Sequence, residues 1–341
     1  MRAGALSRDA PSQSGAFARA ARAFAHWVTF WDRREPATSL AFTRILVGAV
    51  LFLDMVLAIR KGAMPALLAP PPLGMGSGAS AIPEFLPAPA LGSSDVAFLW
   101  WALVLLTSLM FALGLFYKVA GFLLALVLFN FARFDPDGDA IDSLYRVVVP
   151  ILALSGANAC CSFDAWIARR AGKPLPAVVP AWPRYLLMAQ LLWMYFSAGH
   201  CRDDAAWWPH GGFSAIGNVM GDPHFARFRP GSLVSLYPVT QVATAVSMIF
   251  ELSAPLMVLM IWLRKGGGGR WGDILRNWRV RWIWLAVGAA LHLGIALTMT
   301  LGMFPYGVLS LYPLFLHPDE YARARDALRR VVSPRGRPPA A

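Results

Sequence analysis

The chain has 341 residues, of which 57% are hydrophobic and only 15% are charged, and its mean hydropathy is +0.51. This composition is typical of membrane proteins with several spans and excludes most large soluble enzymes. The net charge of +12 would also fit a nucleic-acid-binding protein. The arginines, however, stand in short loops and tails between apolar segments, where they set membrane topology. We therefore expect the lipid bilayer, and no nucleic acid, as the partner.

The N-terminal region predicts an interfacial helix. Residues 1–16 show no structural pattern and are expected to be disordered, and the first 38 residues lack the apolar core and cleavage site of a removable signal peptide. From Phe17 to Trp31, aromatic side chains recur on one helical face and basic side chains on the other. Such a helix lies in the membrane interface as an anchor.

Apolar segments follow along the rest of the chain, most of them near the roughly 20 residues that cross the hydrocarbon core. They predict an all-α fold, a polytopic integral membrane helical bundle of about eight transmembrane helices. The third, fifth and eighth segments are short, so tilted or re-entrant helices are an alternative there. The predicted spans are Ser39–Ile59, Val96–Phe116, Val119–Phe134, Ile141–Asn158, Trp182–Ala198, Gln241–Leu263, Val280–Thr300 and Met303–Leu316.

The basic residues predict the orientation of this bundle. With the N-terminus in the cytoplasm, most of the 31 Lys and Arg residues fall in cytoplasmic segments, as the positive-inside rule requires. We therefore expect a multi-pass protein of the inner (cytoplasmic) membrane with both termini in the cytoplasm. The membrane domain would comprise residues 17–321, and residues 322–341 would form a basic cytoplasmic tail.

Two ionisable residues are expected at the same depth in consecutive spans. Glu251 lies near the middle of the sixth span and His292 near the middle of the seventh. A charge at that depth costs roughly 2.5–3.5 kcal/mol, so it normally has a partner and a function. A carboxylate–imidazole pair would satisfy both groups. It would either handle protons or bind a ligand, or it would be a polar clamp between two helices.

Four further charged residues are candidates for substrate binding. Arg44 and Asp54 share the first span but are about 15 Å apart along the helix axis, too far to pair with each other. Arg44 lies near the inner end, where its side chain could instead extend to the interface. Asp54 and Arg146 both fall toward the outer halves of their spans, so an ion pair between them is allowed. Asp142 begins the fourth span.

A metal site is not expected. The acidic stretch Asp135 to Asp142 resembles a calcium loop but lacks the distal Glu and the helical frame of such a loop. The adjacent Cys160 and Cys161 and the single Cys201 are interpreted as ordinary small apolar side chains. The motifs of soluble serine hydrolases, Walker-type ATPases and zinc proteases do not occur.

Polar, aromatic and glycine residues crowd together at the end of the fifth span. Tyr195 and Arg202 are seven residues apart and would share a helical face. Trp207 and Trp208 follow, with two aspartates between. An aromatic belt with a turn explains the tryptophans but not the density of charge, so we favour a functional site at the outer interface.

Four stretches resemble the HTTM family, the membrane domain of the vitamin K-dependent gamma-carboxylase. They are Phe42-Thr-Arg44 followed by Leu53-Asp54, Tyr195-Phe-Ser-Ala-Gly, the Trp207–Gly211 turn, and His292 with the downstream Gly302-Met-Phe-Pro-Tyr306 and Pro313-Leu-Phe. The last stretch is the most specific. The likeness runs from about Trp27 to Tyr321.

The resemblance also marks two departures. At the position of Arg202 the carboxylase has a lysine, the proposed base toward the vitamin K hydroquinone, whereas arginine stays protonated and is a poor base. At the position of Asp142 it has a histidine. The chain also ends without the carboxylase's extramembrane C-terminal domain. Carboxylation by that mechanism is therefore not expected, and the sequence identifies no cofactor.

Short bacterial HTTM proteins of the sporulation-delaying protein B type are the nearer likeness. They share an arginine at the Arg202 position and a run like Leu316-His317-Pro318. That type takes part in maturing a secreted peptide toxin, so the resemblance implies a role with an exported peptide. Our hypothesis is an outward-opening polar site in which Arg202, Glu251 and His292 are catalytic and Tyr195, Trp207 and Trp208 bind substrate. The alternatives are a quinol-dependent carboxylase-like or redox enzyme and a non-catalytic membrane partner or transport component.

Overall fold

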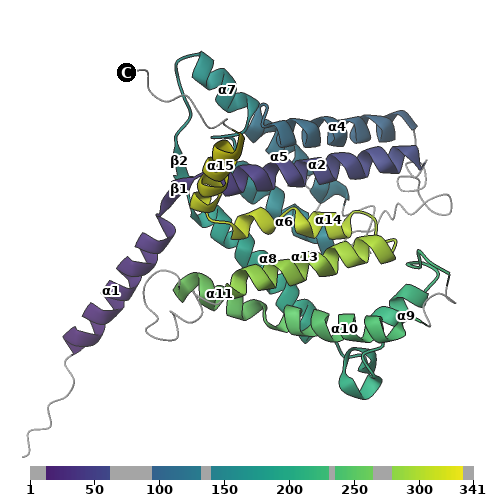
Figure 1. The fold of residues 1–341 in the computed structure, drawn as a ribbon. Helices are drawn as coiled ribbons and strands as arrows, with labels where there is room; N and C mark the ends of the chain where they lie inside the picture. Colours follow the sequence, from purple (N-terminus) through teal and green to yellow (C-terminus); the bar gives the residue numbers. More distant parts are fainter. Residues whose placement is uncertain (1–12, 62–93, 132–139, 230–234, 264–278, 333–341) are drawn as a thin grey trace, which may run out of the picture.

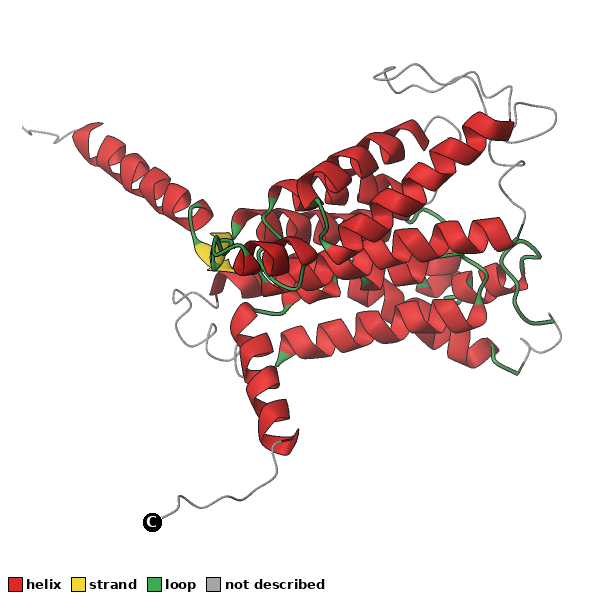
Figure 2. Cartoon of the chain, turned by 90° about the horizontal axis from the view of Figure 1, so that it is seen from above, coloured by secondary structure: helices red, strands yellow, loops and turns green. Residues whose placement is uncertain are grey.

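The computed structural model describes residues 13–61, 94–131, 140–229, 235–263 and 279–332, which form helices and one small sheet (Figure 1). Most of the longer helices lie roughly along one direction as a bundle, while α1 projects from one end of it (Figure 2). The helices of the bundle are α2 (Thr38–Arg60), α4 (Ser94–Leu113), α5 (Tyr117–Phe131), α6 (Ala140–Leu154), α8 (Trp182–His200), α10 (Tyr237–Leu252), α11 (Ala254–Leu263), α13 (Val280–Thr298) and α14 (Phe304–Leu309).

One end of the bundle carries the sheet, and we call it the sheet end (Figure 1). There β1 (Arg34–Pro36) pairs antiparallel with β2 (Val178–Pro180), with Arg34 opposite Pro180. The same end holds α1 (Gln13–Trp31), α7 (Phe163–Arg170) and α15 (Pro318–Val332). Short linkers join the sheet to α2 and α8, so both of these helices start at the sheet end.

The bundle has a hydrophobic core that also encloses several polar and charged side chains. Its fully buried side chains include Arg44, and Glu251 and His292 are no more than 9% exposed. Large hydrophobic side chains, in contrast, stand on the outside of most helices. So many exposed apolar side chains would be unfavourable in water and suit a helix bundle surrounded by lipid. Examples of the exposed residues are Leu53, Leu106, Phe122, Trp193, Ile249 and Leu297.

By length and composition, two of the described helices, α2 and α13, could cross a membrane by themselves. The α10–α11 pair, bent by 43°, would be a third span if it is counted as one. Residues 101–113 of α4 and 117–129 of α5 are apolar but shorter. A helix lies within each predicted span, but the number of about eight membrane crossings stays a prediction.

Three predicted boundaries differ from the structure. The eighth predicted span is not one helix, because α14 ends at Leu309 and a 3₁₀ turn, η4 (Tyr312–Phe315), follows. Pro313 at the start of η4 lacks the N–H that a continuous helix would need. Helix α1 begins at Gln13, inside the segment predicted to be disordered, and α15 makes an ordered helix of most of the tail. Residues 1–12 and 333–341 lie outside the described residues.

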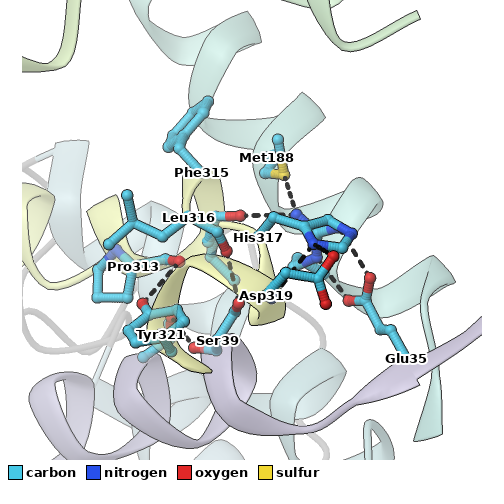
Figure 3. A network of polar contacts seen from close by, with 12 residues as sticks. Glu35, Ser39, Met188, Pro313, Phe315, Leu316, His317, Asp319 and Tyr321 are labelled. Carbon is cyan, nitrogen blue, oxygen red and sulfur yellow. Dashed lines mark hydrogen bonds and ion pairs between the residues drawn. The ribbon is translucent and has the colours of Figure 1, made fainter. Parts of the chain in front are cut away.

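Hydrogen bonds tie the C-terminal segment to the start of α2 (Figure 3). The Ser39 hydroxyl donates to the backbone carbonyl of Leu316 at 2.6 Å, and the Tyr321 hydroxyl donates to that of Pro313 at 3.1 Å. Ser39 is 1% exposed, so these contacts close the bundle at the sheet end.

A buried ion pair lies in the same region. Arg184, near the start of α8, binds both carboxylate oxygens of Glu35 on β1 at 2.5 and 2.8 Å and also donates to the carbonyl of Leu314 at 3.0 Å. The sequence analysis treated Arg184 only as a topological charge. The structure shows instead that this arginine joins β1, α8 and η4 inside the bundle.

Candidate functional site

The fifth predicted span is the continuous helix α8, and the helical path is interrupted directly after it. Helix α8 ends at His200, the chain makes two 3₁₀ turns, η1 (Ala205–Trp207) and η2 (Pro209–Gly211), and α9 (Ala215–Gly221) follows. Helix α8 packs on both α10 and α11, and α9 packs on α10 (Figure 1). Helices α8 and α9 therefore lie one after the other along the α10–α11 pair.

Side-chain hydrogen bonds hold the connecting segment against α10. The Gln241 side-chain amide donates to the carbonyl of Gly212 at 2.6 Å, and the N–H of Ile216 donates to the Thr244 hydroxyl at 3.2 Å. Non-helical backbone needs such partners, since its own polar groups are not satisfied by a helix. Specific hydrogen bonds to α10 thus stabilise the break between α8 and α9.

The second break, at Ser253 between α10 and α11, lies beside the end of α8. A Cβ atom on Gly199 would stand 2.8 Å from the Cβ of Glu251 and 3.3 Å from the backbone nitrogen of Leu252. Only glycine allows the two helices to approach this closely. The close approach brings the last turn of α8 against the last turn of α10.

At this crossing Arg202 and Glu251 form an ion pair. The guanidinium binds both carboxylate oxygens, with N–O distances of 2.6, 2.8 and 2.9 Å, and the side chains are only 20% and 12% exposed. Bidentate pairs of this kind are the strongest that arginine makes. The positive charge of Arg202 is therefore compensated by Glu251.

The two tryptophans surround this ion pair. The guanidinium carbon of Arg202 lies 3.4 Å from the ring centroid of Trp207, and the indole N–H of Trp208 donates to the backbone carbonyl of Arg202 at 2.9 Å. Both tryptophans are half-buried. Cation–π stacking and the backbone hydrogen bond hold Arg202 in one orientation. The structure thus brings together Arg202, Glu251, Trp207 and Trp208.

His292 pairs with a tyrosine and not with Glu251. Its Nε2 lies 2.7 Å from the Tyr195 hydroxyl, which in turn lies 3.1 Å from the Tyr312 hydroxyl. The carboxylate–imidazole pair predicted from sequence is therefore wrong. Glu251 still acts electrostatically on the Tyr195 hydroxyl, so the two clusters are neighbours.

Aromatic rings enclose this histidine–tyrosine cluster. The centroid of the Tyr195 ring lies 4.8 Å from that of Phe250 and 5.7 Å from that of Trp284, and Phe304 lies 5.9 Å from the His292 ring. His292 is 5% exposed, and its Nδ1 is buried without a hydrogen-bond partner in the described structure. A buried polar atom without a partner is costly and marks a position where a ligand or water would bind.

The other four candidates lie apart from this cluster. Arg44 contacts Gly114 and Cys161 near the start of α2. Asp54 and Asp142 both act electrostatically on Tyr145, whose hydroxyl is 2.8 Å from that of Ser310. Arg146 is the half-buried neighbour of Tyr145, and its pairing with Asp54 stays a prediction.

Among the described residues there is no group of three or more His, Cys, Asp or Glu side chains that could hold a metal ion. Residues 135–139 of the acidic stretch lie outside the described residues.

Tyr312 is a residue that the sequence analysis missed. It lies directly before the Pro313-Leu-Phe motif, in a segment predicted to be an apolar helix. Its hydroxyl contacts Tyr195 across 117 residues of sequence. Its proximity to the motif was the only signal that could have singled it out.

Comparison with known proteins identifies the family. The HTTM domain model matches residues 32–268, more than half of the chain. The match covers Arg44, Tyr195, Arg202 and Glu251, whereas the His292 stretch that seemed most specific lies beyond it. Neither the comparison with curated proteins nor that with solved structures returned a match. Because the model matches more than half of the chain and the helices are apolar, the chain belongs to the HTTM family of membrane proteins, which are related to the gamma-carboxylase.

Proposed function

We propose that this HTTM protein binds and modifies an exported peptide at the broken helix formed by α8 and α9. The observation that carries the proposal is the ion pair of Arg202 with Glu251, held beside two tryptophans where two helices are interrupted. Polar groups placed at helix breaks inside a membrane bundle are typical of substrate sites.

The proposal includes an inner-membrane bundle of about eight spans with cytoplasmic termini and an outward-opening site. Arginines at the sheet end support this orientation: Arg33 and Arg34 lie next to β1, Arg169 and Arg170 in α7, and several more in α15. The positive-inside rule assigns such an end to the cytoplasm. Because α8 starts at this end and runs for 19 residues, or about 28 Å, the break would then face the outside.

A peptide suits the charge and shape of the site. Because Arg202 and Glu251 neutralise each other, the pair offers donors and acceptors together, which matches the alternating N–H and C=O groups of a peptide backbone better than it matches an anion. Trp207 and Trp208 would line the entrance, and His292 with Tyr195 would exchange a proton with the substrate deeper in the bundle. The resemblance to the sporulation-delaying protein B type points to the same substrate class.

The vitamin K chemistry of the related carboxylase does not fit these residues. The proposed base of that reaction is a lysine at the position of Arg202, whereas arginine is a poor base, and both carboxylate oxygens of Glu251 bind its guanidinium here. No step is therefore assigned to a quinol here.

A comparison of secreted peptides tests the proposal. One culture carries the wild-type protein and the other carries the His292→Ala variant. We expect mass spectrometry to show at least one peptide whose mass or processing differs, at equal amounts of protein in the membrane. Leu293→Ala is the matched control, because Leu293 is the next residue on α13 but points outward with 49% exposure. Its peptides should equal those of the wild type.

Three outcomes contradict the proposal. Identical secreted peptides from cells with the wild-type protein and cells with His292→Ala would exclude peptide modification. A quinone that co-purifies with the protein and is required for its activity would favour the redox enzyme. Stable co-purification with another chain, with full activity in Arg202 and Glu251 variants, would favour the non-catalytic partner or transport component.

A further inference from the structure

The turn between α6 and α7 carries two adjacent thiols, Cys160 and Cys161, at the sheet end. Cys161 is exposed and Cys160 is half-buried, and neither forms a disulfide. The two side chains are hydrogen-bonded to each other. The interpretation of both residues as ordinary apolar side chains therefore does not hold for Cys161, which faces outward from a turn with φ of 50°.

A buried arginine that forms no ion pair within the described residues lies beneath this turn. Arg44 is 0% exposed, and its Nε and Nη1 have no hydrogen-bond partner in the described structure. Its Nη2 donates to the backbone carbonyl of Cys161 at 2.5 Å. A Cβ atom on Gly114 would collide with Nη1, so the guanidinium is closely enclosed. The Asp164 carboxylate acts on this guanidinium electrostatically without forming an ion pair with it. A buried cation without a close ion pair is costly, and a further negative charge nearby would lower that cost.

The position of Cys161 favours the thiolate for two further reasons. Ser162 caps the N-terminus of α7 by accepting a hydrogen bond from Ala165, so Cys161 directly precedes a capped helix. Helix N-termini and neighbouring arginines both stabilise thiolates. The hydrogen bond from Cys160 and the charges of Arg44 and Arg169 lower the pKa of Cys161 to about 6, while the same pairing raises the pKa of Cys160.

The turn itself is held firmly in place. The carboxylate of Asp164 accepts hydrogen bonds from the backbone N–H groups of Phe116 and Tyr117 and from the side-chain amide of Asn158, at 2.9–3.0 Å. These contacts fix α7 to the connection between α4 and α5. The thiols therefore keep their position above Arg44.

We propose that Cys160 and Cys161 form a thiol–disulfide exchange site, with Cys161 as the attacking thiolate and Cys160 as the resolving thiol. The co-substrate is a low-molecular-weight disulfide such as glutathione disulfide. The Cys161 thiolate attacks one sulfur, forms a mixed disulfide and releases one thiolate. The Cys160 thiol then attacks Cys161 Sγ, loses its proton and releases the second thiol, which leaves a Cys160–Cys161 disulfide. An accessible thiolate beside a resolving cysteine is the arrangement of redox-sensitive sites.

The product would be easily reduced again. Consecutive Cα atoms are only about 3.8 Å apart, below the usual range of roughly 4.4–6.8 Å for disulfides, and strained disulfides are the labile ones. The site therefore suits reversible rather than structural oxidation, and it lies far along the chain from the α8–α9 break. It is independent of the proposed peptide modification.

The pH dependence of alkylation tests whether Cys161 is the attacking thiolate. The experiment uses the full-length Cys201→Ser protein, in which Cys160 and Cys161 are the remaining thiols. A lowered pKa keeps the thiolate populated above pH 6 and loses it as the pH falls below. The rate of Cys161 alkylation by iodoacetamide should thus be half-maximal near pH 6, against roughly pH 8.5 for an unperturbed thiol. A midpoint in the ordinary thiol range would overturn the proposal.

Mass spectrometry after treatment with glutathione disulfide tests the resolving step. We expect a transient glutathione adduct on Cys161 and then loss of two hydrogens from the peptide that holds both cysteines. Cys160→Ser should stop at the adduct. A stable adduct with Cys160 present, or no adduct, would contradict the proposal.

Arginine variants check that charge controls this reactivity. Arg169→Gln should move the alkylation midpoint to higher pH, whereas Arg170→Gln should not, because Arg170 stacks on Trp166 at 4.1 Å instead. Both residues are exposed, so neither change should unfold the protein. Equal midpoints in both variants and the parent protein would exclude a role for Arg169, and a shift with Arg170→Gln alone would contradict the assigned geometry.

Discussion

At the scale of single residues, the partner of each buried charge decides what that charge can do. Glu251 could have paired with His292, with Arg202 or with a ligand, and it binds the nearest guanidinium through both oxygens. Within the described residues, His292 is left with a tyrosine and one nitrogen that has no hydrogen-bond partner. The acid and the imidazole thus serve two neighbouring clusters, connected through Tyr195, instead of one.

Removing one member of the Arg202–Glu251 pair should destabilise the protein more than removing both. In Arg202→Met, Glu251 would remain buried and unpaired, at a cost of about 3 kcal/mol. The double variant Arg202→Met/Glu251→Leu should recover much of that loss, because no isolated charge remains. Melting temperatures in detergent measure both effects. A double variant that is less stable than Arg202→Met would show that the ion pair itself stabilises the fold.

At the scale of the elements, two interrupted helices make the site. Had α8 continued without a break, Arg202 would follow the helical path along α10, and the tryptophans would not lie around it. The break instead turns the chain outward at His200 and returns it to α10 at Gly212. Close packing of α8 on α10 at Gly199 is what sets Arg202 beside Glu251.

Gly199→Ala should therefore disrupt this crossing. The new methyl group would meet the Cβ of Glu251 at 2.8 Å, so α8 and α10 would have to separate, at a cost of about 1–3 kcal/mol. Gly294→Ala is the control, because Gly294 is also helical and a Cβ atom there would meet nothing within 4 Å. The control should be neutral or slightly stabilising. Equal melting temperatures for both variants would show that α8 and α10 do not need this close approach.

At the scale of the whole molecule, the sheet end joins the N-terminal and C-terminal parts of the described chain. Arg184 with Glu35, Arg281 with Glu320, and Ser39 with Leu316 connect segments that are far apart in sequence. Helices α1, α7 and α15 lie at the same end of the bundle (Figure 1). In the proposed orientation all three helices lie on the cytoplasmic side.

Labelling of single cysteines in intact cells tests this orientation. In a cysteine-free background, Arg325→Cys in α15 and Asp204→Cys before η1 are both exposed positions. A membrane-impermeant maleimide should label position 204 and not position 325 until the cells are opened. Labelling of both positions, or of position 325 alone, would contradict cytoplasmic termini with an outward-opening site.

The sequence by itself determined the class of the protein, the position of most helices and the residues worth attention. Apolar length, helical periodicity and charge bias are local properties, so they can be read without a structure. They located α2, α8, α10–α11 and α13, and they singled out Arg202, Glu251 and His292. They also missed α15, because its mixed charges resemble a solvated tail.

Only the tertiary structure decided which of these groups meet. The pairs Arg202–Glu251 and Tyr195–His292 are separated by 49 and 97 residues, and each depends on how its helices rotate, bend and approach. A rotation of one helix by one residue turns a side chain by about 100°, which no local pattern specifies. The break after His200 and the close packing at Gly199 fix that rotation, and so they determine the site.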